Sequence, residues 1–297
     1  MASRPALRDA ARRTGTAGLR GVAQRVDADY TWDDLVLPSG TMRRLRQLEG
    51  AIRHRDEVFG SWAFGRLAGG HTSVRALFAG PSGTGKTMAA SVLGSRLGMD
   101  VFRVDLSSVV SKYIGETEKN LERILGAAEH GNAILFFDEA DALFGKRSEV
   151  KDAHDRYANI EVAFLLQRLE TFDGIVVLAT NLATNLDEAF SRRLHFTIDF
   201  PAPDEAARLE LWRRAFPPAA PVAGDVDVDF LASRFVITGG EIRAASLMAA
   251  FLAATDRAPI SMTHVVLALA RLRRQQGRIP SAGEFGAHLR AANDGAA

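Results

Sequence analysis

The chain has 297 residues, of which 47% are hydrophobic and 25% are charged, as in a soluble globular protein with one large domain or two modest ones. Its 37 Lys and Arg residues against 36 Asp and Glu leave a net charge of +1, whereas a dedicated nucleic-acid binder usually carries a large basic excess. The absence of cysteine excludes disulfides and thiolate chemistry, and the longest apolar runs are far shorter than the ~20 residues of a membrane span.

The first 29 residues are rich in arginine and contain scattered glycine and alanine. They lack the continuous apolar stretch of a secretory signal, although an organelle transit peptide has a comparable composition. We interpret residues 1–29 as a flexible tail or an adaptor-binding arm. We therefore expect a cytoplasmic protein.

From Tyr30 to residue 200 the pattern alternates between strands and helices. Short apolar runs predict five strands, over 74–80, 101–106, 133–139, 174–181 and 195–200. Between them, helical spacing predicts helices over 86–97, 120–130 and 157–172, the first ending at Gly98. Strands that alternate with helices indicate βαβ units and a five-stranded parallel sheet covered on both faces.

A second domain is predicted after residue 200, because Pro201 and Pro203 stop the last strand and Asp204 can cap a helix. The chain then has helical patterns only, over 204–216, 228–234, 239–254 and 261–274. We assign 30–200 to an α/β domain, 201–277 to a small helical domain and 278–297 to a C-terminal tail.

The segment "GPSGTGKT", from Gly80 to Thr87, fits the pattern G-x-x-x-x-G-K-[ST] and lies between a predicted strand and a predicted helix. Glycines let backbone N–H groups surround phosphate oxygens, and Lys86 adds a charge toward the β- and γ-phosphates. Thr87 offers a hydroxyl to Mg²⁺. The predicted ATP-binding residues are Gly80, Pro81, Ser82, Gly83, Thr84, Gly85, Lys86, Thr87 and Met88.

Polar residues follow two later buried strands. "ILFFDE" ends in Asp138, predicted to hold Mg²⁺ together with Thr87, and Glu139, predicted to polarise the attacking water. Asn181 ends "LATN" and can position that water, although an asparagine there is more often a turn residue. Arg192 and Arg193 precede the last strand; such a pair is usually a solvated surface feature, but an arginine can also stabilise the γ-phosphate of a neighbouring subunit.

In this order and spacing, Gly80–Thr87, Asp138–Glu139, Asn181 and Arg193 resemble the Walker A, Walker B, sensor 1 and arginine-finger motifs of the AAA+ ATPases. The helices after Pro201 resemble the lid domain of that superfamily. The resemblance covers about residues 30–275 and implies a P-loop NTPase fold, ATP and Mg²⁺ as cofactors, and a ring, expected to be a hexamer.

Within the superfamily, "SKYIGETEKN" resembles the first pore loop of AAA proteins that thread polypeptide, with Lys112, Tyr113, Ile114 and Gly115 at its tip. "TGGEIRAA" resembles the sensor 2 segment, whose arginine position falls on Gly240 and not on Arg243, as in the katanin and spastin group. The charged segment 146–161 corresponds either to a second pore loop or to a solvated face. One departure is Phe196, which stands where many members carry a second arginine, so Arg192 is a candidate substitute.

"FGKRSEVKDAHDRYANIEVAFLLQRLETFDG" is similar to AAA ATPases encoded with bacterial phage-tail-like contractile injection systems. The preferred function is an ATP-hydrolysing ring that remodels, unfolds or threads a protein substrate. Two alternatives remain: an ATP-gated assembly or scaffold factor that threads nothing, and a DNA-directed loader, for which the chain offers no basic surface or appended module. The histidines show no metal-ligand spacing, and we expect neither a membrane nor a nucleic-acid partner.

Overall fold

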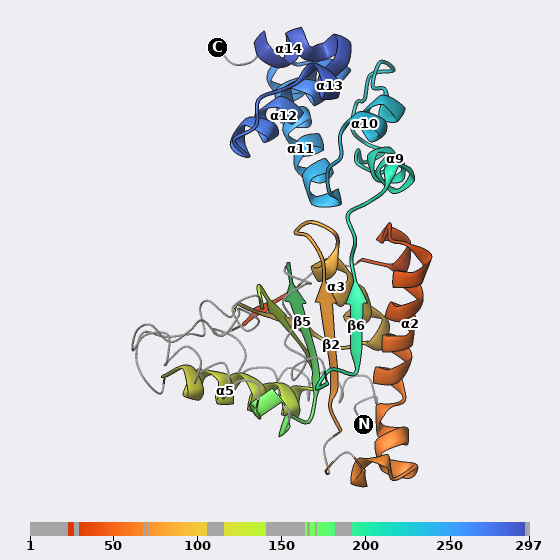
Figure 1. Ribbon diagram of the computed structural model, residues 1–297, viewed down its shortest axis with the longest axis vertical. Coiled ribbons are helices and arrows are strands. Elements are labelled where there is room, and N and C mark those ends of the chain that lie inside the picture. Colours follow the sequence, from red (N-terminus) through yellow and green to blue (C-terminus); the bar gives the residue numbers. More distant parts are fainter. Residues whose placement is uncertain are drawn as a thin grey trace, which may run out of the picture. The chain divides into compact units, whose positions relative to one another are not determined.

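The computed structural model describes residues 23–26, 30–67, 69, 72–105, 116–140, 164, 167–169, 171–181 and 192–294. The chain divides into two compact units (Figure 1). Unit 1 comprises Met1–Gly80 and Lys86–Phe200, and unit 2 comprises Pro81–Gly85 and Pro201–Ala297. The boundary after Phe200 lies directly before Pro201 and Pro203, the prolines that we predicted to stop the last strand.

Unit 1 contains a six-stranded sheet in the order β1-β3-β4-β5-β2-β6. Five strands run parallel, as predicted: β2 (Val74–Ala79), β3 (Val101–Asp105), β4 (Ile134–Asp138), β5 (Ile175–Thr180) and β6 (Phe196–Asp199). The predicted five-stranded sheet is incomplete, because β1 (Gln24–Arg25) pairs antiparallel with β3. These two residues belong to the segment that we interpreted as a flexible tail.

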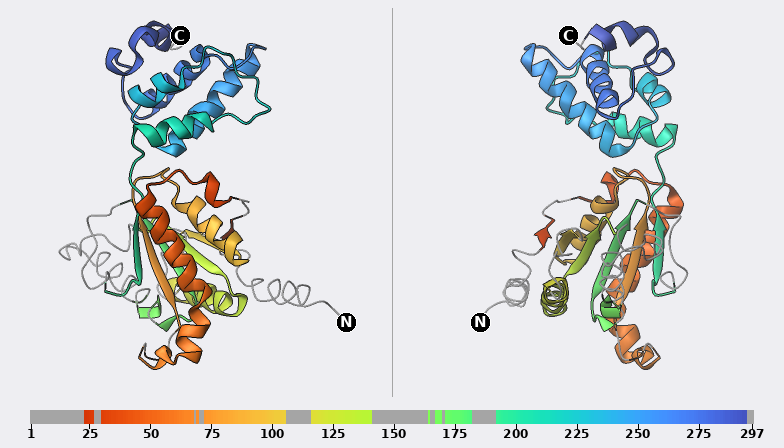
Figure 2. Two further views of the ribbon diagram at one scale, coloured as in Figure 1. Left: turned by 90° about the vertical axis from the view of Figure 1, so that its right-hand side faces the viewer. Right: turned by 60° about the vertical axis from the view of Figure 1, so that its left-hand side comes forward.

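The central strands β4 and β5 are mostly apolar and buried, as expected for a sheet with helices on both faces (Figure 2). Along β4, Ile134 and Phe136 pack with helices α2 (Ser39–Arg53) and α3 (Lys86–Leu97). Leu135 and Phe137 point to the other face, where they pack with α5 (Glu116–Gly131). Helix α2 was not among the predicted elements; its Leu45 and Leu48 are completely buried on the first face.

Three short elements complete unit 1 among the described residues: the 3₁₀ turns η2 (Trp32–Asp34) and η4 (Phe64–Arg66), and the π-helical turn η3 (Glu57–Ser61). Of the predicted helix over 157–172, the structure describes residues 164, 167–169, 171 and 172; all of these are helical except Phe172, which follows the end of the helix.

Unit 2 is helical beyond Pro201. Its four main helices lie close to the predicted ranges: α9 (Glu205–Arg213), α10 (Val228–Arg234), α11 (Gly239–Thr255) and α12 (Met262–Gln275). Asp204, Asp227 and Thr238 cap the first three, each accepting a hydrogen bond from a backbone N–H of the first turn. The helices enclose a core around Trp212, Phe235 and Phe285, all completely buried.

The prediction of a tail over 278–297 is wrong for residues 282–294. These residues form α13 (Ala282–Phe285), η6 (Gly286–His288) and α14 (Leu289–Asp294). Phe285 lies edge-on to Phe235, with ring centroids 5.0 Å apart, and Ala292 is also completely buried. This apolar burial, which depends on residues distant in the chain, stabilises the segment. Within the described residues no helix is long and apolar enough to cross a membrane.

Candidate active site

The candidate phosphate loop joins β2 to α3. Its glycines are required by backbone geometry, since Gly80, Gly83 and Gly85 have φ angles of 152°, 76° and 101°. At Gly80 a Cβ atom would lie 2.0 Å from the carbonyl oxygen of Phe200, a contact that no other residue type can accept. The Thr84 hydroxyl donates to the carbonyl oxygen of Pro81 at 2.8 Å and closes the turn.

Lys86 begins α3 and is buried, with 7% of the residue exposed. Its Nζ atom donates to the carbonyl oxygen of Gly80 at 2.5 Å and to Oδ1 of Asn181 at 2.9 Å. Asn181 directly follows β5, the neighbour of β2 in the sheet. The structure therefore brings together two predicted site residues that are 95 positions apart in the chain.

The two predicted acidic residues end β4. Asp138 is on the same face as Phe136 and α3, since side chains alternate along a strand. Its Oδ1 accepts a hydrogen bond of 3.0 Å from the backbone N–H of Glu139, and its Oδ2 lies 2.8 Å from Nη2 of Arg103. Glu139 is exposed and has a φ of 53°, a left-handed conformation that is uncommon for glutamate and clusters at functional sites.

Arg103, on β3, lies at this site and was not among the predicted site residues. The available signal was an arginine inside the otherwise strand-like "VFRVDL", where a side chain on a covered sheet needs a partner.

Arg192 and Arg193 lie at the opposite end of the sheet from the phosphate loop. They precede β6, and β6 is parallel to β2, with Phe196 opposite Ala76 and Asp199 opposite Ala79. Gly80 therefore follows the end of β2 at which β6 also ends, whereas both arginines precede its start. These side chains cannot reach the phosphate loop of their own chain.

His195 follows the two arginines and pairs with β2. Its backbone N–H donates to the carbonyl oxygen of Arg75 at 2.9 Å, and its Nδ1 accepts from the backbone N–H of Arg75 at 3.1 Å. Partial burial and, secondarily, the Arg75 charge lower the pKa of His195 below its ordinary value of 6.5. The neutral imidazole is thus the form that this strand pairing requires.

Within unit 2, the loop segment Pro81–Gly85 contacts the first turn of α11. The backbone N–H of Gly240 donates to the carbonyl oxygen of Gly83 at 2.9 Å. A Cβ atom on Gly240 would lie 2.9 Å from Cα of Gly83, so the backbones meet only because both residues are glycine. Gly240 is the predicted sensor 2 position, and this contact leaves no room there for a side chain.

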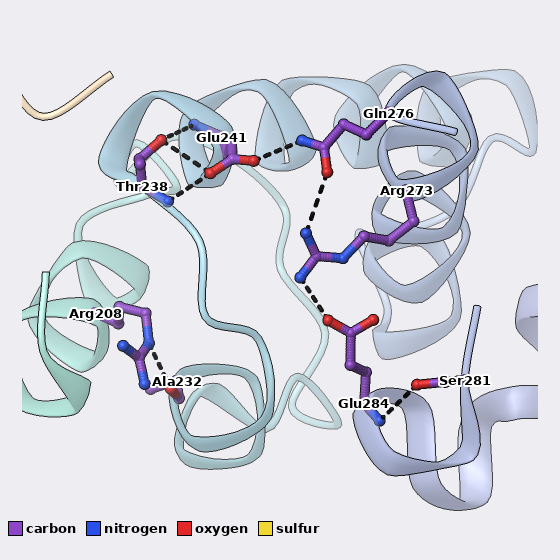
Figure 3. Close-up of polar contacts among 8 residues, drawn as sticks. All are labelled: Arg208, Ala232, Thr238, Glu241, Arg273, Gln276, Ser281 and Glu284. Atoms are coloured by element: carbon purple, nitrogen blue, oxygen red, sulfur yellow. Dashed lines mark hydrogen bonds and ion pairs between the residues drawn. The ribbon is translucent and has the colours of Figure 1, made fainter. Parts of the chain in front are cut away.

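A polar network holds that first turn (Figure 3). Oε2 of Glu241 accepts from the backbone N–H of Thr238 at 2.6 Å, and Oε1 accepts from Nε2 of Gln276 at 2.6 Å. Oε1 of Gln276 accepts from Nη1 of Arg273 at 3.2 Å, and Nη2 of Arg273 lies 2.6 Å from Oε1 of Glu284. The network thus links α11 through α12 to α13.

Glu241 is ionised in this arrangement. Burial raises the pKa of its carboxyl group, but hydrogen bonds from Thr238 and Gln276, together with the Arg273 charge, outweigh burial and lower the pKa below 4.5. The negative charge sits in the first turn of a helix, where the helix dipole also favours it.

The predicted pore-loop residues Lys112, Tyr113, Ile114 and Gly115 lie outside the described residues, as does the segment 146–161. The remaining site residues fit Mg²⁺-bound ATP. The loop has a buried ammonium group and glycine backbones, the arrangement that receives phosphates. Thr87 and Asp138 supply the oxygen ligands that Mg²⁺ prefers.

Comparison with known proteins agrees with this geometry. The model of the family "ATPase family associated with various cellular activities (AAA)" matches residues 76–202. An uncharacterized AAA family ATPase, y4kL, of Sinorhizobium fredii is 31% identical over 183 residues, covering 62% of this chain and 53% of the relative. The 26S proteasome subunit RPT4 of Saccharomyces cerevisiae is 31% identical over 217 residues, covering 68% of this chain and 49% of the relative.

This chain thus spans about half the length of these two relatives. Among solved structures, the FIGL-1 AAA domain superposes with a TM-score of 0.65 at 19% identity and covers 93% of each chain, which shows a shared fold. The family match agrees with the structure, which has a mostly parallel sheet, a candidate phosphate loop between β2 and α3, and polar residues at the strand ends. Residues 76–202 of the chain therefore match the AAA ATPase family domain.

Proposed function

We propose that the protein is a ring-forming ATPase that hydrolyses Mg-ATP and uses the energy to remodel a protein substrate. The observation that carries this proposal is the cluster at the carboxyl end of the sheet. There, the buried Lys86 donates a hydrogen bond to Asn181. Two strands end in polar residues at this place, and the helix that carries Thr87 begins there. Such a crevice is where parallel sheets bind ligands.

Each side chain has a definite role in the proposed reaction. Lys86 binds the β- and γ-phosphates, and Thr87 and Asp138 hold Mg²⁺, which neutralises charge on the phosphate oxygens. Glu139 polarises the attacking water, and Asn181 orients it toward the γ-phosphate. Lys86 and Asn181 already contact each other, so the asparagine is close to the position of the transferred phosphoryl group.

The proposal requires more than one subunit. Arg192 and Arg193 are placed at the end of the sheet away from their own phosphate loop, so an arginine finger from this pair would serve a neighbour. An arginine supplied in trans accelerates phosphoryl transfer by about 10³–10⁵. Assembly into a ring, with six subunits as the expectation, gives every site such an arginine.

Protein remodelling is favoured over the two alternatives by the relatives, which include a proteasome subunit, and by the resemblance of Lys112–Gly115 to a substrate-gripping loop. The net charge of +1 gives no support to a DNA loader. A role in a phage-tail-like contractile injection system is the more specific form of the proposal, and a scaffold that only switches is the main competitor.

The variant Glu139→Gln tests the nucleotide site. We expect it to bind ATP, to lose turnover and to accumulate as an oligomer that retains bound partner proteins. Steady-state phosphate release, nucleotide binding and sedimentation measure the three properties. Exposed Glu205→Gln is the matched control, and unchanged turnover in Glu139→Gln would contradict the assigned role.

Mixing Arg193→Ala subunits with Glu139→Gln subunits tests the trans arginine. Each variant alone should be inactive, whereas the mixture should regain partial activity where an intact Glu139 meets an intact Arg193. Arg192→Ala shows how the two arginines share the role. An inactive mixture that still forms mixed rings would contradict catalysis in trans.

Tyr113→Ala separates threading from switching. The remodelling proposal expects near-normal basal hydrolysis and loss of substrate unfolding, with Tyr113→Phe restoring unfolding. If Tyr113→Ala unfolds a labelled substrate as fast as the unmodified protein, the chain does not thread through this residue.

A further inference from the structure

Asp138, the proposed Mg²⁺ ligand, is already paired with a cation of this chain. Nη2 of Arg103 lies 2.8 Å from Oδ2 of Asp138, and the two side chains are 43% and 18% exposed. The other carboxylate oxygen accepts the backbone N–H of Glu139 at 3.0 Å. Both oxygens of the proposed metal ligand therefore have partners from the protein.

Strand register explains why these residues meet. Arg103 is opposite Phe136, and Asp105 is opposite Asp138, in the parallel pair of β3 and β4. Arg103, Asp105 and Asp138 thus share one sheet face, and Arg103 is the diagonal neighbour of Asp138, within reach of a long side chain. That face is the one covered by α3, the helix that carries Thr87.

Two carboxylates in adjacent positions on one face repel each other. A guanidinium group near them lowers the repulsion, so Arg103 supplies at Asp138 the positive charge that a divalent cation supplies when it binds. A guanidinium and Mg²⁺ cannot both approach the same carboxylate closely without a Coulomb cost.

We propose that Arg103 is the resident counter-ion of Asp138 and that Mg²⁺ must displace it. This inference rests on the proposed nucleotide site. Arg103 acts as a positioning residue: it holds the carboxylate in one orientation when no metal is bound, and it weakens metal binding by competition. By linkage, metal binding releases Arg103 from Asp138, and Arg103 lies on the strand that precedes the predicted substrate loop Lys112–Gly115.

The test measures metal affinity and does not depend on turnover. The full-length protein is saturated with a non-hydrolysable ATP analogue, and Mn²⁺ is titrated while free Mn²⁺ is followed by electron paramagnetic resonance. Arg103→Met should bind Mn²⁺ about three- to tenfold more tightly than the unmodified protein, because a partly exposed ion pair no longer competes. Arg103→Lys, which keeps the charge, should remain near the unmodified value.

Arg44→Met is the matched control, since Arg44 lies 3.8 Å from Asp199 at the end of another strand and is similarly exposed. It should leave Mn²⁺ affinity unchanged. The inference would be overturned if Arg103→Met bound Mn²⁺ with unchanged or weaker affinity. It would also be overturned if Mn²⁺ affinity rose equally in Arg103→Met and Arg44→Met.

Binding of the analogue is measured first by fluorescence, which separates the two levels of the proposal. Absence of analogue binding in the unmodified protein would defeat the proposed function and this inference together. Analogue binding with no change in metal affinity would defeat this inference alone. Thermal unfolding in the presence of EDTA establishes that each variant is folded.

Discussion

The ion pair between Arg273 and Glu284 gives the sharpest test of how unit 2 is held together. The Arg273 side chain is 3% exposed, that of Glu284 is 29% exposed, and the pair is 2.6 Å apart. Glu284→Leu leaves a buried guanidinium without its ion-pair partner; the 3.2 Å hydrogen bond to Gln276 and the charge of Glu241 nearby remain.

Breaking a buried ion pair from one side costs about 3–5 kcal/mol. Because Glu284 retains some contact with solvent, we expect the lower end of that range, about 3 kcal/mol, for Glu284→Leu. Arg273→Met should cost less, since the orphaned carboxylate can be hydrated. The double variant should be within about 1 kcal/mol of the original protein, because two apolar side chains remove both charges together.

Trp212 provides the assay, because it is completely buried in the core of unit 2. The other two of the three tryptophans, Trp32 and Trp62, belong to unit 1 and are replaced by phenylalanine. Urea unfolding followed by Trp212 fluorescence then reports the free energy of unfolding of unit 2. A cost below about 1 kcal/mol for Glu284→Leu, or a double variant as unstable as the sum of the singles, would refute the reasoning.

Three further predictions concern stability. Phe285→Ala should lower the free energy of unfolding by about 3–5 kcal/mol, because it leaves a cavity beside Phe235. The control Phe251→Ala, at a 61% exposed position, should lower it by less than about 0.5 kcal/mol. Urea unfolding with Trp212 fluorescence measures both values, and equal losses would contradict the packing. His195→Asn should flatten the pH dependence of the stability of unit 1. The pKa of His195 is lowered in the folded state, so its contribution to stability is fully present above pH 6.5 and is lost as the pH falls through the folded pKa. Between pH 7.5 and 5, the melting temperature should therefore decrease less for the Asn variant than for the original protein. Gly80→Ala should destabilise unit 1 by at least about 1–3 kcal/mol through its φ of 152° alone, and an unchanged urea midpoint would contradict the required conformation.

Local sequence patterns predicted most elements because burial on both sheet faces and on one helix face leaves a strong periodic signal. The strands β2 to β6 and the helices α9 to α12 lie within a few residues of their predicted bounds. The pattern failed for β1, whose two residues pair through backbone groups and carry no apolar signal. It also failed for residues 282–294, where Phe285 is buried by helices that precede it by tens of residues.

In the candidate site, too, some features could be predicted from local sequence and others depend on residues that are distant in the chain. The candidate phosphate loop Gly80–Thr87 could be proposed from the sequence, since its glycines and lysine lie within eight residues, and the structure gives Gly80, Gly83 and Gly85 the positive φ angles that favour glycine. Arg103 could not be assigned a partner, because its contact with Asp138 depends on the register of β3 against β4.

The sequence by itself indicated the family resemblance, the candidate phosphate loop and the order of the polar strand ends, because these depend on residue type and on short spacing. Only the tertiary structure decided that Lys86 meets Asn181, that Arg103 pairs with Asp138, and that Arg192 and Arg193 lie at the far end of the sheet from their own site. The reason is physical: strand order and register bring together side chains that are distant in the chain, and neither property is a local feature of the sequence.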